Sequence, residues 1–176
     1  MQVEYVILVN NNDQPLGAME KMEAHEKGAL HRAFSIFIFN TKGQLLLQKR
    51  AEEKYHSPGL WTNTVCSHPR TGEKTLDAAH RRMKEEMGFD CNIEEIFSFT
   101  YKANVGGGLM EHEFDHVFMG TSDTVPDPDP EEVAEWKYVE MDWLYEDVDA
   151  NPGDYTVWFV IALAELRKHL EKHKAS

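Results

Sequence analysis

Runs of apolar residues separated by turn-forming residues predict a series of short strands. The first covers residues 4–9 and ends at a run of Asn and Asp at 10–13, which is typical of a turn. Residues 33–39 are apolar at nearly every position, which predicts a buried strand. A short polar stretch ending at Gly43 follows, and it predicts a hairpin whose second strand covers residues 44–49.

The rest of the chain alternates in the same way between short apolar segments and segments rich in Gly, Pro and acidic residues. We expect a loop at 51–60, a short extended segment at 61–65, strands at 97–101, 111–119 and 136–139, a turn at 106–108, and an acidic, proline-rich loop at 122–135.

Two segments have the periodicity of a helix. The apolar residues of the first, which covers residues 76–87, recur every three or four positions: Leu76, Ala79, Met83 and Met87. We expect Thr75 to cap its start and Gly88 its end. At about 100° per residue, Glu86 lies at the edge of the apolar stripe and should face a cleft, whereas Glu85 should face water. The second helix covers about 155–169.

Strands around one central helix, with a closing helix, predict an α+β fold, an α/β sandwich. The 176 residues fit a single domain, 1–176, with its core at about 30–166. The net charge of −13 argues against a nucleic-acid partner, because phosphates would repel such a surface. An anionic substrate then requires metal ions or a local cluster of Arg and Lys.

No apolar run is long enough to span a membrane, and no basic stretch precedes an apolar one near the start. We therefore expect a cytoplasmic protein without a membrane partner, and a monomer, with a dimer as the alternative. In that setting Cys66 and Cys91 are expected to be free thiols. Cys91 has no His nearby in the sequence, which favours a structural role.

Three histidines and two glutamates are candidate metal ligands: His25, His31, His68, Glu111 and Glu113. Residues two apart on a strand share a face, so the two carboxylates project together and would repel each other without a cation or a proton between them. Imidazole with carboxylate suits zinc or manganese, and magnesium less well. The alternative is that each side chain is an ordinary solvated or hydrogen-bonded group.

The segment 61–69 brings Cys66 and His68 to one face if the chain is extended. An imidazole beside a thiol can hold it near its reactive pKa. The alternative is that Cys66 is a small buried apolar residue, the usual state of a free cysteine.

The pattern Ser67-x5-Glu73-x7-Arg81-Arg82-Met83-x-Glu85-Glu86-x-Gly88-Phe89 resembles the Nudix box, a loop and helix that bind a divalent cation on a diphosphate. Ser67 stands where a glycine is expected, and Arg82 where an acid is expected. Loss of that acid should weaken the metal cluster that activates water in Nudix hydrolases, and a base in its place favours binding of the diphosphate.

The whole chain, from about residue 2 to 166, resembles the type I isopentenyl-diphosphate delta-isomerases, a branch of the Nudix superfamily. The resemblance is carried by the segment 16–21 leading to His25 and His31, by Trp61-Thr-Asn-Thr-Val-Cys66-Ser-His68-Pro69, by Arg81 to Gly88, and by Glu111-His-Glu113. The departures are Ser67 and a short interval between His25 and His31. The resemblance implies mixed sheets around the loop and helix, with an added N-terminal segment.

It also implies reversible 1,3-allylic isomerisation of isopentenyl diphosphate to dimethylallyl diphosphate through a carbocation-like state, in isoprenoid biosynthesis. Two acid–base groups on opposite sides of the substrate are needed, and Cys66 and Glu113 match them. Tyr101 matches a position that assists proton delivery, although it can also be a packed strand aromatic. The five metal ligands would hold one divalent ion (Mn, Zn or Mg), and Glu86 a Mg²⁺ that arrives with the diphosphate.

The resemblance further implies how the substrate is bound. Lys21, Arg50, Lys54 and Arg82 match basic positions that hold the diphosphate, Trp158 matches an aromatic face for the cation, and Trp61 is an alternative wall of the pocket. Two other functions compete with this interpretation. One is a Nudix-type diphosphate hydrolase, and the other is a non-catalytic module that binds a metal or a diphosphate.

Overall fold

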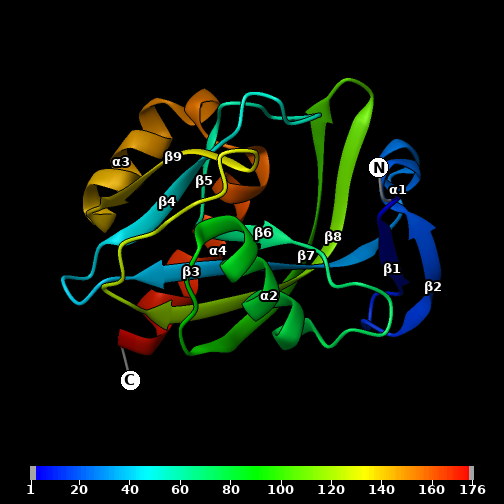
Figure 1. The fold of residues 1–176 in the computed structure, drawn as a ribbon, viewed down its shortest axis with the longest axis horizontal. Helices are drawn as coiled ribbons and strands as arrows, with labels where there is room; N and C mark the ends of the chain where they lie inside the picture. The colour runs from blue at the N-terminus through cyan, green and yellow to red at the C-terminus, as the bar shows by residue number, and fades with distance from the viewer. Residues whose placement is uncertain (1–2, 175–176) are drawn as a thin grey trace.

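Strand β3 (His31–Phe39) lies at the centre of the molecule (Figure 1). The computed structural model describes residues 3–174. β3 pairs with β1 (Tyr5–Val9), β4 (Leu45–Arg50) and β6 (Val65–Ser67) in antiparallel fashion. Its pairing with β8 (Leu109–Thr121) is parallel and runs the whole length of β3.

The other strands extend this framework on each side. Within residues 3–174, nine strands form one mixed sheet. β2 (Pro15–Glu20) pairs with β1, β5 (Trp61–Thr62) and β9 (Val133–Val139) pair with β4, and β7 (Ile93–Gly106) pairs with β8.

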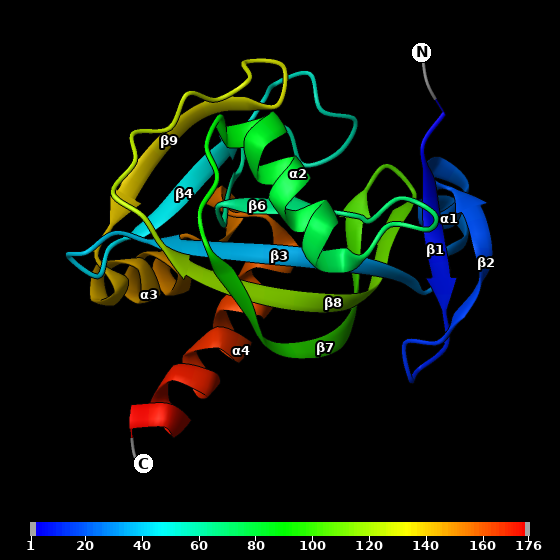
Figure 2. The same cartoon turned by 60° about the horizontal axis from the view of Figure 1, so that its bottom comes forward.

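Helices cover both faces of the sheet. Figure 2 shows α2 (Thr75–Met87) on one side of β3, and α3 (Met141–Ala150) and α4 (Val157–Lys174) on the other. A short 3₁₀ turn, Pro152–Asp154, joins α3 to α4. α1 (Lys21–Lys27) lies with β1 and β2 at the end of the sheet and contacts β8. This α+β architecture is the one that the sequence predicts. None of the described helices is long and apolar enough to cross a membrane.

The alternating side chains of β3 belong to two separate cores. Phe34, Ile36 and Ile38 pack with the apolar stripe of α2, whereas Phe37 packs with α3 and α4. Successive side chains of a strand point to opposite faces, and a strand covered on both faces needs apolar residues at nearly every position. This explains the continuous apolar run of β3.

The central helix lies close to where the apolar stripe predicted it. Gly88 ends it in the left-handed conformation, with φ 70°, which a glycine adopts without a steric penalty. The prediction that Thr75 caps its start was wrong. Thr75 is the first helical residue, and Lys74 is the N-cap without a side-chain cap. The carbonyl of Lys74 accepts the first helical hydrogen bond, from the backbone N–H of Ala78 (3.0 Å).

The sequence did not predict β2, α1 or α3. The hairpin of β7 and β8 is also longer than the two strands predicted at 97–101 and 111–119. The added residues of β7 mix exposed polar positions with apolar ones that are mostly only partly buried, so no continuous apolar run marked them as strand. The extended segment 61–65 is divided between β5 and β6. The predicted strands at 44–49 and 136–139 are present as β4, which begins one residue later at Leu45, and as the second half of β9.

Candidate active site

One cavity of about 610 Å³ gathers most of the expected site residues. Its wall is built from β1, α1, β3, the end of β4, β6, α2, β8 and the start of α4, together with the loop at 51–60, the segment 68–71 and Glu132. The expected site residues on this wall are Lys21, Arg50, Lys54, Cys66, His68, Arg82, Glu86, Glu111, Glu113 and Trp158. His25 and His31 are fully buried behind it.

Different elements bring the candidate metal ligands together. The ligand atoms of His25, His31, His68 and Glu111 all lie within 4.8 Å of one another. Parallel pairing of β3 with β8 places His31 opposite Glu113. Only residues 28–30 connect α1 to β3, and Gly28 there has φ 65°, so the short interval before His31 is spanned by a tight turn.

Hydrogen bonds to backbone carbonyls determine which ring nitrogen of His25 and of His31 carries the proton and which one faces this cluster. Nδ1 of His25 lies 2.6 Å from the carbonyl of Lys21, and Nδ1 of His31 lies 2.9 Å from that of Ala29. Because a carbonyl can only accept, each Nδ1 carries the proton. In the neutral rings the two Nε2 atoms are therefore left with lone pairs that point into the cluster.

The separations between these atoms fit a divalent ion. Nε2 of His31 and Nε2 of His68 are 3.2 Å apart, and Nε2 of His25 lies 2.8 Å from Oε1 of Glu111. Ligands at right angles around an ion about 2.1 Å away are about 3.0 Å apart. Oε2 of Glu111 is buried without a hydrogen-bond partner among the described residues. The donor set therefore suits a divalent metal, as in metal sites of mixed imidazole and carboxylate.

Glu113 joins this cluster to a tyrosine. Its Oε2 lies 2.7 Å from Nε2 of His68 and 3.3 Å from Nε2 of His31, and its Oε1 accepts a hydrogen bond from the Tyr101 hydroxyl. Burial acts to raise the pKa of Glu113, but hydrogen bonds from His31 and His68, when these rings are protonated at Nε2, hold it well below the ordinary value. Burial and Glu113 raise the pKa of Tyr101 well above 10.

Cys66 has other partners than the expected histidine. Its thiol donates to Oδ1 of Asn63 (2.8 Å) and accepts from Nε1–H of Trp158 (3.3 Å). Burial raises the pKa of Cys66 to about 12, so the thiol is protonated at neutral pH. The prediction that His68 keeps the thiol near a reactive pKa was therefore wrong, because Nε2 of His68 is directed at Glu113 and His31.

The backbone before Cys66 is held by buried polar side chains. Asn63 donates from Nδ2 to the carbonyls of Ile36 and Val65, and Thr64 donates to the carbonyl of Leu46. Both side chains are fully buried. Ser67 is absent from the described residues with positive φ, so this position does not require the glycine that the Nudix box usually has.

The two tryptophans lie in different parts of the molecule. Trp158 is 5% exposed, lines the cavity and has the guanidinium carbon of Arg50 5.1 Å from its ring centroid. Trp61 is not among the cavity residues; it packs against the core under α3 and α4, with Nζ of Lys137 4.2 Å from its ring centroid. The assignment of Trp61 to the pocket wall was wrong, because pairing of β5 with β4 places it in that second core.

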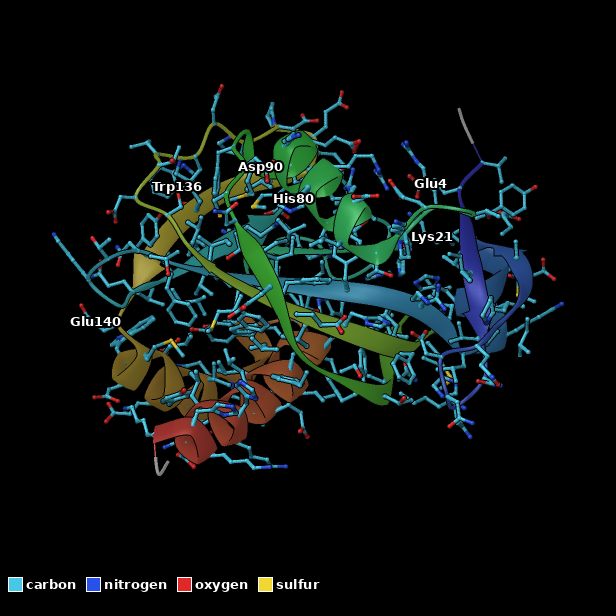
Figure 3. All side chains as sticks on the ribbon, turned by 90° about the horizontal axis from the view of Figure 1, so that it is seen from below. Glu4, Lys21, His80, Asp90, Trp136 and Glu140 are labelled. Atoms are coloured by element: carbon cyan, nitrogen blue, oxygen red, sulfur yellow. The ribbon has the colours of Figure 1, made fainter. Side chains whose placement is uncertain are left out.

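Three of the cavity cations, Lys21, Lys54 and Arg82, have an acidic neighbour. Lys21 pairs with Glu4, and Figure 3 shows the two side chains reaching toward one another. Lys54 pairs with Glu132, and Nη2 of Arg82 lies 3.5 Å from the same carboxyl group. Sequence patterns did not single out Glu4 or Glu132, since neither belongs to a motif and only the packing of distant segments makes them neighbours.

The two adjacent acids of α2, Glu85 and Glu86, point in the directions that helical spacing predicts. Glu86 is 4% exposed, and burial, with a further contribution from Glu132, raises its pKa to about 7. Glu85 stays near the surface and binds the guanidinium groups of Arg81 (3.2 Å) and Arg82 (2.7 Å). Glu73 accepts two hydrogen bonds from Arg81, at 2.8 and 2.9 Å, which ties the loop of the Nudix-like segment to its helix.

Four buried polar atoms of the cavity residues have no hydrogen-bond partner in the part of the chain that the structure describes. Two are donors, Nε of Arg50 and Nε of Arg82, and two are acceptors, Oε2 of Glu86 and Oε2 of Glu111. An unsatisfied buried donor or acceptor is costly. Guanidinium donors favour an anion such as phosphate, and carboxylate oxygens favour a cation. The cavity therefore suits an anionic ligand together with divalent ions.

Two further polar residues of the site were not predicted. His56, in the loop at 51–60, is 6% exposed, and its Nε2 lies 3.1 Å from Oε1 of Glu111. Asp115, on β8, is buried and accepts a hydrogen bond from Ser35 (2.7 Å); burial raises its pKa well above the ordinary value. The strand alternation that pairs Glu111 with Glu113 also includes Asp115, but no sequence signal pointed to His56.

Comparison with known proteins gives close relatives. Residues 29–159 match the NUDIX domain family. An isopentenyl-diphosphate Delta-isomerase of Pectobacterium atrosepticum is 48% identical over 175 residues, which cover 99% of this chain and 98% of that protein. One of Serratia proteamaculans is 50% identical over 163 residues, covering 93% of this chain and 91% of that protein.

The fold has a counterpart among solved structures. The crystal structure of DR0079 from Deinococcus radiodurans superposes with a TM-score of 0.76 at 20% identity and covers 92% of this chain and 98% of that one. This likeness concerns the fold alone. The family match and the full-length relatives establish the relationship: the chain belongs to the NUDIX domain family and, within it, to the isopentenyl-diphosphate Delta-isomerases.

Proposed function

We propose that this protein interconverts isopentenyl diphosphate and dimethylallyl diphosphate by 1,3-allylic isomerisation, a step of isoprenoid biosynthesis. The observation that carries the proposal is the chemistry of one cavity. It places unsatisfied guanidinium donors and unsatisfied carboxylate oxygens beside a thiol and a carboxylate, Cys66 and Glu113. A diphosphate with divalent ions satisfies the first set, and the second set can exchange protons with a carbon chain.

Cys66 and Glu113 are the proposed acid–base pair. One adds a proton to a terminal carbon of the alkene unit and the other removes a proton two carbons away. Because the reaction is reversible, each group acts as an acid in one direction and as a base in the other. The Trp158 N–H bond to the Cys66 sulfur (3.3 Å) would stabilise the thiolate, and the Tyr101 hydroxyl bound to Glu113 would steer the proton of that carboxyl group.

The intermediate state carries positive charge on carbon, which an aromatic face stabilises by about 0.5–2 kcal/mol. Trp158 is the proposed aromatic group, because its ring lines the cavity beside Cys66. The surrounding wall must also keep water from the cation, and the burial of Trp158 and Tyr101 supports this.

The diphosphate is proposed to bind to Lys21, Arg50, Lys54 and Arg82, with a Mg²⁺ held by Glu86. His25, His31, His68, Glu111 and Glu113 would hold the second ion, for which Mn²⁺ and Zn²⁺ suit the three imidazoles better than Mg²⁺. When bound, this ion would neutralise the paired carboxylates and lower the proton affinity of Glu113. The same cations explain how a chain with net charge −13 accepts an anion.

The test is incubation of the metal-loaded protein with isopentenyl diphosphate and Mg²⁺ in D₂O. We expect deuterated dimethylallyl diphosphate by NMR, and loss of at least 1,000-fold in kcat, on the order of the contribution of a positioned acid or base, in Cys66→Ala and in Glu113→Gln. Cys91→Ala is the matched control, because this thiol packs against the core on the α2 side; its rate should equal that of the wild type.

Intact substrate after incubation with folded, metal-loaded protein would contradict the proposal. Release of inorganic phosphate or diphosphate instead would favour a hydrolase. Unchanged activity in Cys66→Ala would remove the thiol from the mechanism while leaving the reaction itself established.

A further inference from the structure

We propose that His56 is a positioning residue for the metal site: it holds Glu111 in the orientation that binds the ion and joins this carboxylate to the Trp158 wall. The inference rests on the proposed metal site and adds a residue to it. His56 belongs to none of the motifs in the sequence, and it is nearly fully buried although it lies in a polar loop.

Its hydrogen bonds fix which ring nitrogen carries the proton. Nε2 lies 3.1 Å from Oε1 of Glu111. An ionised carboxylate can only accept, so this nitrogen donates. Nδ1 lies 3.3 Å from Oγ of Ser57, and a hydroxyl can donate to it. The neutral ring therefore satisfies both neighbours in one tautomer, with Ser57 donating to His56 and His56 donating to Glu111.

Glu111 has few other means of being held. Its Oε1 also lies 2.8 Å from Nε2 of His25. When Nε2 of His25 binds an ion it carries no proton and cannot donate to Glu111, because the ring proton is then on Nδ1 and donates to the carbonyl of Lys21. Oε2 of Glu111 has no partner among the described residues. A hydrogen bond from His56 thus orients the carboxylate while leaving Oε2 free for a cation, which is how outer groups commonly orient metal ligands.

The loop is built so that His56 keeps this position. Its ring meets the ring of Trp158 edge to face, with centroids 5.4 Å apart and planes at 86°. Its carbonyl accepts a hydrogen bond from Nη2 of Arg50 (3.2 Å). The next residue, Ser57, has φ 50°, a left-handed conformation that is unfavourable for a residue other than glycine. Such an outlier persists where the surrounding contacts over-determine it.

These contacts connect three parts of the proposed machinery. The ring of His56 contacts a metal ligand and the aromatic wall, and its backbone contacts an arginine of the diphosphate site. A buried imidazole that only filled space would not need a hydrogen-bond donor toward Glu111. The nitrogen is therefore the feature to test, separately from the shape of the ring.

The experiment measures the affinity of the intact protein for Mn²⁺, by the electron paramagnetic resonance signal of free Mn²⁺ during titration. His56→Phe keeps an aromatic ring beside Trp158 and removes the donor, and we expect the dissociation constant to rise about 10–100-fold. His56→Gln keeps a donor of similar reach and should recover most of the affinity. His80→Phe is the control, because His80 lies on α2, pairs with Asp90 (2.6 Å) beyond the end of that helix (Figure 3), and is not among the residues that line the cavity; its affinity should equal that of the wild type.

If His56→Phe does not give the circular dichroism spectrum of the wild type, His56→Asn takes its place. Its amide is too short to reach Glu111, so the same loss is expected. Wild-type protein that binds no Mn²⁺ would overturn the metal site and the role of His56 together. Equal Mn²⁺ affinity in the wild type and in the folded Phe or Asn variant would overturn only the role of His56. An equally weak Gln variant would do so as well.

Discussion

At the scale of single residues, Cys66 and Glu113 are held in opposite protonation states. Burial raises the pKa of Cys66 to about 12, while two histidines hold the pKa of Glu113 well below its ordinary value. At neutral pH one group is a proton donor and the other a proton acceptor. Environments that push the pKa values of two groups apart are typical of acid–base pairs.

The raised pKa of Cys66 predicts slow alkylation. In the Cys91→Ala background, iodoacetamide at pH 8 should modify folded protein at least tenfold more slowly than protein unfolded in guanidinium, because the thiolate is the reactive form. The rate should keep rising with pH above 9. Mass spectrometry measures the reaction. A titration of the rate with a midpoint near pH 7 would mean that the thiol is activated by a neighbouring imidazole after all.

Glu86 and its neighbour Glu85 should affect the pH dependence of stability in opposite directions. Burial raises the pKa of Glu86 from an ordinary value of 4.5 to about 7 in the folded protein, so the folded state binds the proton more tightly than the unfolded state. Stability is therefore lost as pH rises from 4.5 to 7. In metal-free protein, Glu86→Gln should match the wild type below pH 4.5 and exceed it at pH 8, by at most about 3 kcal/mol, in urea unfolding. In Glu85→Gln, which removes a carboxylate with a lowered pKa, stability at pH 8 should fall instead.

Sequence patterns identified those site residues that follow a regular spacing along a strand or a helix. Alternation along a strand identified Glu111 and Glu113, and helical spacing identified Glu86. His56 and Glu132 lie in irregular segments, where side-chain direction does not follow from position. Their neighbours come from elsewhere in the chain, so only the folded structure brings them to the site.

At the scale of elements, α2 follows from a regular pattern in the sequence, whereas α1 depends on packing against distant parts of the chain. The apolar stripe and Gly88 were sufficient to predict α2. α1 spans only Lys21–Lys27, has no side-chain cap, and buries Ala24 and His25 against other parts of the chain. A helix this short is marginal on its own, so its existence depends on packing against β8, which a local pattern does not contain.

Replacing Gly88, which ends α2, with any other residue should measurably lower the stability of the protein. A Cβ there would lie 2.1 Å from the carbonyl oxygen of Asp127, in addition to the strain of φ 70°. We expect Gly88→Ala to lower the free energy of unfolding by more than about 2 kcal/mol, because the left-handed strain and the steric overlap add. Gly72→Ala is the control, because Gly72 has φ 81° but open space around it; it should cost only the left-handed strain, about 1–2 kcal/mol. Equal costs for the two variants would mean that the loop after β8 moves freely.

At the scale of the whole molecule, β3 joins two cores into one cooperative unit. Met83 lies fully buried in the core under α2, and Leu166 in the core under α4. Met83→Ala and Leu166→Ala should each cost about 2–5 kcal/mol. Because both cores share β3, each variant should unfold in a single transition that circular dichroism and tryptophan fluorescence report alike. Separate transitions for the two probes in either variant would mean that the layers unfold independently.

The parallel pairing of β3 with β8 also has a consequence for how the protein folds. His25 and Glu111 are 86 positions apart in the chain, and the register that aligns His31 with Glu113 closes a loop of similar length. Closing such loops is entropically costly and slows folding. During synthesis the first histidines are made long before the carboxylates that complete the cluster. We therefore expect the candidate metal site to form late in folding, and we expect a bound ion to act chiefly by slowing unfolding.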